Sequence, residues 1–291
     1  MILNVTNNFL IFDYSYILKV IGERIYSKYS ENFSLDTNDL KEIYKIDFSK
    51  NEFFMQLMIK EFQNTIKNIQ INLYTPERNV CFALDCPRKN IWRRSYFPEY
   101  KIQRDIKAAK EEGFNLRPVF YEFRKVLNNI CRDNGYHILE DSVCEADDFI
   151  YGLTNYLNKN FVNCKIRSIS RDKDFFQIPN IELYDIHLEK VIPLYDVPKK
   201  NLLFKLISGD KSDGIPSCFH KVPKHKILSK GCGDKTAKLI LEDKELLRQL
   251  LEEFPDSRIR FKMNKQIIDF NAIPLDIMNI INSKIEKEFP H

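Results

Sequence analysis

The chain has 291 residues, of which 44% are hydrophobic and 30% charged, and its formal net charge is +4. This is the balance of an ordinary soluble globular protein. The first apolar run, MILNVTNNFLIFD, is too short to cross a bilayer and has no basic leader, so we expect a cytoplasmic protein that needs no membrane. None of the seven cysteines forms a C-x-x-C pair, which argues against a disulfide framework and a zinc site.

Short β-rich or apolar runs recur through the first two thirds of the chain. They predict strands at 8–12, 80–84, 136–139, 165–170 and 181–185. Between them, apolar residues at three- and four-residue spacing predict helices over 53–66 and 118–131, the second ending before Gly135 as its C′ residue. Ser142 and Glu145 form a capping-box pattern for a further helix over about 143–158.

From residue 200 onward the chain changes character. Helical patterns continue without a convincing strand, at 201–207, 235–242, 244–254 and 274–289, the last with Pro274 at its first position. Strands that alternate with helices predict an α/β fold with a mostly parallel sheet. We therefore expect an α/β domain over residues 1–197 and a helical subdomain over 198–291.

Acidic side chains follow the predicted strands and open a predicted helix. Two predicted strands lead directly into an aspartate and a third into an aspartate one residue further on, and in an α/β sheet these ends share one edge, where ligands collect. Each acid taken singly is also a common turn or capping residue, but their repetition at such positions favours a site. The candidates are Asp13, Asp85, Glu145, Asp147, Asp148, Asp172, Asp174, Asp210 and Asp213.

So many converging carboxylates require cations to stay ionised. Oxygen ligands without histidine or thiolate select Mg²⁺ or Mn²⁺ over zinc. Two such ions, activating water and holding the attacking and leaving oxygens, would catalyse an in-line phosphoryl displacement.

Two segments are basic. Residues 86–110 hold eight lysines and arginines against two acids, with Trp92, Tyr96, Phe97 and Tyr100 interleaved. Cations track a phosphate backbone and aromatic rings stack on bases, so this segment suits a single-stranded or frayed end. A solvated basic face is the plainer alternative.

The second basic segment, 219–238, carries six lysines against one acid. Its Gly231-Cys232-Gly233 before a helical pattern is similar to a helix–hairpin–helix turn, whose backbone N–H groups hold a phosphate.

Taken in series, the motifs FDYSYIL, ALDCPRKNIWRRSYFPEYKIQR, EADDFIYGL, SRDKDFFQI, GDKSDG and GCGDKTA resemble the structure-specific 5′ nuclease, or flap endonuclease, family, in particular its bacteriophage members. The resemblance covers most of residues 8–282. It implies a PIN/5′-nuclease-like sheet, a helical arch over about 86–118 and a duplex-binding helical subdomain. It also implies a bacteriophage protein that acts in the host cytoplasm.

The resemblance assigns residue roles as well. It implies that Asp13, Asp85, Glu145, Asp147 and Asp148 bind the ion that activates water, and that Asp172, Asp174, Asp210 and Asp213 surround a second ion. Asp13, Asp148, Lys101 and Arg104 would be catalytic, the last two meeting the scissile phosphate. Nucleic acid would be contacted by Arg93, Arg94, Tyr100, Lys101, Arg104, Lys107, Gly231, Gly233, Lys235, Thr236 and Lys238. Residues 214–230 separate the last acid from the glycines, which is a longer spacing than the family commonly has.

The resemblance favours a Mg²⁺- or Mn²⁺-dependent 5′→3′ exonuclease and flap endonuclease that removes RNA primers and 5′ flaps in DNA replication. Its partners would be branched or 5′-ended DNA, RNA–DNA duplex and replication proteins such as a single-strand-binding protein, and we expect a monomer. Two alternatives stay open: an RNA-only 5′ exonuclease of the same fold, and a catalytically idle protein that binds branched DNA.

Overall fold

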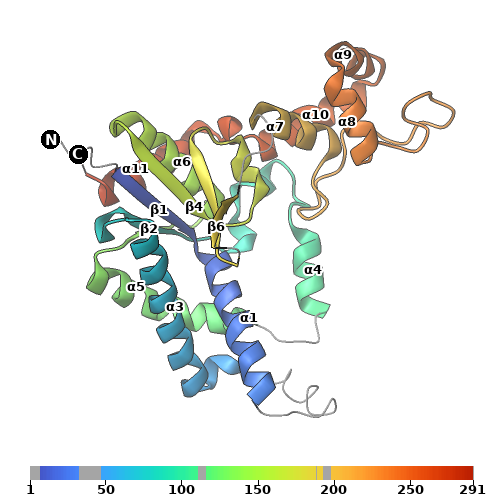
Figure 1. The fold of residues 1–291 in the computed structure, drawn as a ribbon. Helices are drawn as coiled ribbons and strands as arrows, with labels where there is room; N and C mark the ends of the chain where they lie inside the picture. The colour runs from blue at the N-terminus through green and yellow to red at the C-terminus, as the bar shows by residue number, and fades with distance from the viewer. Residues whose placement is uncertain (1–6, 33–46, 111–115, 188, 193–197, 291) are drawn as a thin grey trace.

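The computed structural model describes residues 7–32, 47–110, 116–187, 189–192 and 198–290. Its centre is one six-stranded sheet in the order β3-β2-β1-β4-β5-β6 (Figure 1). The strands are β1 (Asn7–Asp13), β2 (Val80–Ala83), β3 (His137–Leu139), β4 (Cys164–Ile169), β5 (Ile181–Asp185) and β6 (Lys190–Ile192). Neighbouring strands run parallel except β5 and β6. The predicted mostly parallel sheet is confirmed.

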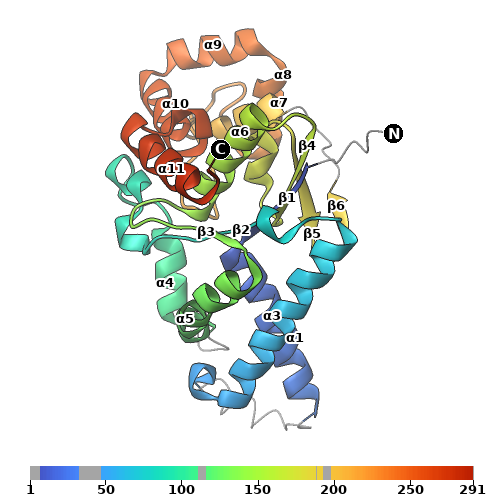
Figure 2. The same ribbon diagram turned by 90° about the vertical axis from the view of Figure 1, so that its left-hand side faces the viewer.

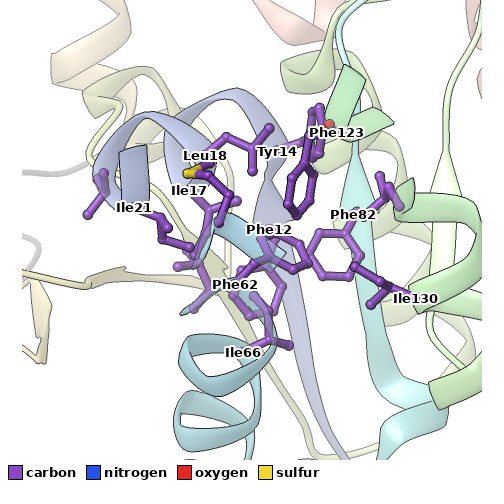
Figure 3. Close-up of a cluster of buried hydrophobic side chains, with 14 of the residues drawn as sticks. Phe12, Tyr14, Ile17, Leu18, Ile21, Phe62, Ile66, Phe82, Phe123 and Ile130 are labelled. Atoms are coloured by element: carbon purple, nitrogen blue, oxygen red, sulfur yellow. The ribbon is translucent and has the colours of Figure 1, made fainter. Parts of the chain in front are cut away.

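Alternate residues of the central strands face two different helical layers. On one face, α1 (Tyr14–Asn32), α3 (Glu52–Asn72) and α5 (Arg117–Asn134) cover Leu10, Phe12 and Phe82. Figure 3 shows the aromatic centre of this layer, where the Phe12 and Phe82 rings stack with centroids 5.0 Å apart. Burial of such side chains is the main stabilising contribution to this half of the sheet.

On the other face lie α6 (Ala146–Asn160) and α11 (Leu275–Glu288), packed on Phe9 and Ile11 of β1 (Figure 2). The two helices approach closely at Gly152, where an added Cβ would lie 2.4 Å from the Ile281 side chain. The C-terminal part of the chain therefore returns to complete the core of the α/β sheet. The predicted division at residues 197 and 198 stays a prediction, because 193–197 lie outside the described residues.

The remaining C-terminal helices have a small core of their own. They are α7 (Pro198–Ser208), α8 (Asp234–Glu242), α9 (Lys244–Glu253) and α10 (Pro255–Ile268). Ile207, Phe219, Leu228 and Ile240 are among the buried residues that join them. In both views α8 and α9 lie at the opposite end of the molecule from the free ends of α1 and α3 (Figures 1 and 2).

Short elements occupy the connections between the longer ones. They are η1 (Phe48–Lys50), η2 (Glu77–Asn79), η3 (Arg88–Asn90), η4 (Trp92–Ser95), α4 (Ile102–Lys110), η5 (Lys173–Gln177) and η6 (Phe270–Ala272). No helix of the described ranges combines the length and apolarity needed to cross a membrane.

Several local predictions can be compared with these elements. Gly135 ends α5 in the left-handed conformation, with φ of 68°, as predicted. The predicted start of the next helix was wrong: α6 begins at Ala146, and the Asp148 side chain, not Ser142, accepts from the backbone N–H of Glu145 at 2.9 Å. Pro274 precedes α11 as its N-cap instead of occupying its first position. Both α1 and the three-residue strand β6 had not been predicted.

Candidate active site

The strand ends bring three of the predicted acids to one edge of the sheet. Asp13 is the last residue of β1, Asp85 follows β2 and Asp172 follows β4. Strands β2 and β3 are added on one side of β1, and β4, β5 and β6 on the other. The direction in which strands are added therefore reverses at β1, and these acids flank that point. Ligands of α/β sheets bind at such a point because the connections diverge there.

Hydrogen bonds from neighbouring elements orient two of these carboxylates. Ser15 Oγ donates to Asp85 Oδ2 at 2.8 Å, and the backbone N–H of Ala146, at the start of α6, donates to Asp85 Oδ1 at 3.0 Å. Asp13 accepts from the backbone N–H of Tyr16 at 3.1 Å. These donors fix the carboxylates without neutralising their charge.

The acids repel one another. Burial, then the charges of Asp85 and Asp172, raise the pKa of Asp13 to about 7. Burial, then Asp172, also raises the pKa of Asp147 well above its usual value, and Glu145 and Asp13 add to this effect while Lys101 opposes it. A bound cation would relieve this repulsion.

The residues present fit a hard divalent cation by their chemistry. Within the described residues, however, no group of three or more aspartate, glutamate, histidine or cysteine side chains is arranged so that it could hold a metal ion. Among those same residues, no lysine or arginine forms an ion pair with Asp13, Asp85, Asp147 or Asp172. Four carboxylates without a lysine or arginine in ion-pair contact are the ligand type that Mg²⁺ and Mn²⁺ prefer.

A second acidic group carries its own cation. The Lys205 ammonium lies 2.8 Å from Asp210 Oδ2 and contacts Asp174 directly. Burial raises the pKa of Asp174 to about 6 against the opposing charge of Lys205. Burial is also the largest single effect on Asp210, where it raises the pKa. The Lys205 charge and the hydrogen bonds from Lys205 and Ser212 together outweigh it and lower the pKa of Asp210 to about 2. Lys205 was missed in the sequence, where it is one more lysine in the last turn of a predicted helix.

Lys101 and Arg104 of the basic segment reach the same region. Lys101 Nζ lies 2.6 Å from Glu145 Oε1 and 3.7 Å from Asp213 Oδ2, and its side chain is buried. Arg104 pairs with Asp213 but keeps 43% of its side chain exposed. Of these two predicted phosphate contacts, Arg104 is the one that solvent, and hence a substrate, reaches in this structure.

Asp148 is buried and surrounded by hydrogen-bond donors of the protein itself. Its side chain is 0% exposed and accepts from Trp92 Nε1 at 3.0 Å, Arg93 Nη2 at 2.7 Å and the backbone of Glu145. Glu145 is also buried, between Arg93 and Lys101, and these two cations outweigh burial and lower its pKa. This position does not support the predicted catalytic and metal-binding role of Asp148. Both of its carboxylate oxygens already accept hydrogen bonds from Trp92, Arg93 and the Glu145 backbone, and the side chain is closed to solvent.

The basic segment also departs from its prediction. Arg93 is 4% exposed and Tyr100 is 4% exposed, so neither forms a nucleic-acid surface here. Arg94 donates to the Tyr100 carbonyl oxygen at 3.0 Å and pairs with Asp105 at 2.8 Å. Lys107 belongs to α4, but its side chain lies outside the described part. Arg93 and Arg94 thus hold the basic segment in place. The sequence alone does not distinguish such structural cations from cations that contact a substrate.

The predicted hairpin is a longer connection. Helices α7 and α8 pack together, but residues 209–233 join them and bury Cys218, Phe219 and Leu228 on the way. Gly231 has φ of 85°, and Gly233 precedes the exposed start of α8. Lys235 and Lys238 are exposed and Thr236 is half-buried. Phosphate contacts of these residues stay a prediction.

A cavity of about 1560 Å³ lies beside the second acidic group and α8. It lies between η5, α7 and α8, and Asp174, Lys205, Asp210 and Lys238 are among its lining residues. Lys238 of α8 and the second acidic group, Asp174 and Asp210 with Lys205, therefore open onto one space.

Comparisons with known proteins identify the family and the fold. Residues 42–201 match the family of 5′–3′ exonuclease N-terminal, resolvase-like domains. The chain belongs to this 5′ nuclease family. It is also 28% identical over 170 residues to DNA polymerase I of Rhizobium leguminosarum, an alignment that covers 55% of this chain and 15% of the polymerase.

Solved structures of bacteriophage T5 proteins share the fold over most of the chain. The T5 5′-exonuclease with bound zinc is 17% identical, with a TM-score of 0.61 over 97% of this chain and 100% of that one. A T5 flap endonuclease in a complex with DNA and metal ions is 17% identical, with a TM-score of 0.60 over 97% of this chain and 99% of that one. At these identities the likeness shows the fold.

Proposed function

We propose that this protein is a divalent-metal-dependent 5′→3′ exonuclease and flap endonuclease that acts on DNA and on RNA–DNA hybrids. The observation that carries the proposal is the group of Asp13, Asp85, Asp147 and Asp172, four acids at one sheet edge without a lysine or arginine in ion-pair contact among the described residues. The 5′ nuclease family and the metal-bound and DNA-bound T5 structures support it.

In this proposal the four acids hold Mg²⁺ or Mn²⁺, with Asp174, Asp210 and Asp213 beside a second ion. When bound, such ions supply a nucleophilic water and neutralise charge on the phosphate. Arg104 extends from α4 toward the same acids and is placed to pair with a substrate phosphate in exchange for Asp213. Lys101 holds Glu145 and, through its backbone N–H, the Asp213 carbonyl oxygen at 2.8 Å, so it positions both neighbouring elements.

The biological part of the proposal rests on the resemblance in sequence. The protein would remove RNA primers and 5′ flaps during DNA replication, as a monomer in the host cytoplasm of a bacteriophage. A single-strand-binding protein is a candidate partner. The exposed lysines of α8 suit the duplex part of such substrates, because phosphate contacts need no base identity.

The test is a cleavage assay on three labelled substrates: a 5′-flap DNA, an RNA–DNA duplex and a single-stranded RNA. Each is incubated with the protein in Mg²⁺ or in EDTA, beside an Asp172→Asn control that removes one carboxylate of the unpaired group. The proposal expects metal-dependent cleavage of the first two. Cleavage of RNA alone would instead favour an RNA-only exonuclease, and tight flap binding without any cleavage a catalytically idle protein.

A further inference from the structure

Lys205 lies between two acids, Asp174 and Asp210, that the family resemblance places around a second metal ion. Its Nζ is 2.8 Å from Asp210 Oδ2 and also contacts Asp174 Oδ1. The Lys205 side chain is only 26% exposed, and those of Asp174 and Asp210 are 21% and 15% exposed. An ion pair this far removed from solvent is screened less than one on the surface.

The ammonium is held there by a well-packed backbone. Lys205 belongs to the last turn of α7, where the next residues, Leu206 and Ile207, are buried. Asn264 of α10 donates to the Leu206 carbonyl oxygen at 3.0 Å, which ties the end of α7 to its neighbour. The lysine stem thus starts from a fixed point.

The Asp210 carboxylate is fixed as well. Gly209 has φ of 71°, and a Cβ there would lie 2.4 Å from the Ile215 carbonyl oxygen, so the turn requires glycine. The backbone groups of Asp210 and Ile215 exchange hydrogen bonds of 2.9 and 2.8 Å. Ser212 donates to Asp210 Oδ1 through both its N–H, at 2.8 Å, and its hydroxyl, at 2.7 Å. Both oxygens of Asp210 are therefore already in use.

The two halves of the acidic region differ in this respect. Asp13 and Asp85 accept hydrogen bonds from serine hydroxyls and backbone N–H groups, which leave their charge uncompensated. Asp174 and Asp210 instead share a full positive charge. A lysine ammonium and a divalent cation cannot occupy the space between the same two carboxylates, because they repel each other and compete for the same oxygens.

We infer that Lys205 is an internal cation in the place of the second divalent ion. This inference rests on the proposed function and refines its metal requirement. One ion binds tightly through the unpaired group, Asp13, Asp85, Asp147 and Asp172. A second binds only when the Lys205 ammonium is displaced from Asp174 and Asp210.

The experiment is a titration of the metal-free protein with Mn²⁺, in which free Mn²⁺ is followed by electron paramagnetic resonance. Native protein is compared with Lys205→Met, which keeps the length of the stem and removes the charge, and with Lys205→Arg, which keeps the charge. Lys173→Met is the matched control, because Lys173 is an exposed lysine of η5 between Asp172 and Asp174. Thermal unfolding with and without Mn²⁺ shows that each variant is folded.

The inference expects one tight Mn²⁺ ion for native protein, Lys205→Arg and Lys173→Met. Lys205→Met should bind two, the second at least about tenfold more tightly than in native protein, which corresponds to the loss of one close charge repulsion. Mn²⁺ should also raise the melting temperature of Lys205→Met more than that of native protein.

Two results would overturn the inference. Two equally tight ions in native protein and in Lys205→Met would show that Lys205 does not compete, and would leave the proposed function intact. The absence of any bound Mn²⁺ in every variant would overturn the inference together with the metal-dependent function on which it rests.

Discussion

The Arg93 guanidinium and the Asp148 carboxylate form a two-pronged ion pair inside the protein. Arg93 Nη2 lies 2.7 Å from Asp148 Oδ1, and Nη1 lies 3.1 Å from Oδ2, with side chains 4% and 0% exposed. Arg93 also donates to the Ile267 carbonyl oxygen at 2.9 Å. This pair therefore ties the basic segment to the start of α6 and to the end of α10.

Asp148→Asn should act on stability more than on metal binding. Removing one charge from this buried pair leaves the Arg93 guanidinium short of a counter-ion, which costs about 3 kcal/mol of the free energy of unfolding. Urea unfolding measures this loss, and Mn²⁺ titration should find the tight ion retained. Asp172→Asn is the control, for which the opposite is expected: no loss of stability in EDTA, and loss of the tight ion. Loss of metal affinity in Asp148→Asn without destabilisation would restore its predicted role as a ligand.

Asp13→Asn should stabilise the metal-free protein in a pH-dependent way. The folded-state pKa of Asp13 is raised from 3.8 to about 7. The protonated side chain therefore contributes to the free energy of unfolding in full below pH 3.8, and this contribution is lost as the pH rises to about 7. Asparagine is neutral throughout. The variant should therefore match native protein near pH 4 and exceed it by on the order of 1 kcal/mol at pH 8. Urea unfolding in EDTA at several pH values tests this, and a pH-independent difference would contradict it.

Arg104→Ala should slow cleavage more than it weakens substrate binding. If its partner is the reacting phosphate, losing this cation costs about 100-fold in single-turnover rate. Arg88→Ala is a matched control, since Arg88 has a similar exposure of 41% and pairs with Asp105 in α4. Equal rate losses in both variants would show that the basic segment contributes only a general positive field.

Removing Lys235 and Lys238 together should weaken the binding of duplex-bearing substrates. Both lysines are exposed on α8, and each lost phosphate contact flattens the log–log dependence of affinity on salt by about one unit. Salt titrations on a duplex and on a short single strand measure the slopes. A double variant of Lys60 and Lys67, exposed on α3, controls for net charge. Equal losses on duplex and single strand would contradict a separate duplex contact.

Periodicity and local chemistry were enough to predict the sheet and most helices. The strand 8–12 is a short apolar run with two phenylalanines and an isoleucine, and burial on both faces of a parallel sheet selects such runs. Gly135 was identifiable because a helix end needs a left-handed residue there. Helix α1 was not predicted, although its buried residues Tyr14, Ile17, Leu18, Ile21 and Ile25 recur at the three- and four-residue spacing of an amphipathic helix.

The sequence by itself determined that carboxylates gather at the end of a parallel sheet, since each acid follows its own strand or opens a helix. Only the tertiary structure decided which of them have counter-ions. Arg93 meets Asp148 across 55 residues, and Arg104 meets Asp213 across 109. Such pairs depend on where whole segments pack, and no local pattern of charge encodes that. The division of the acids into an unpaired group and a group that already holds Lys205 is therefore a property of the fold.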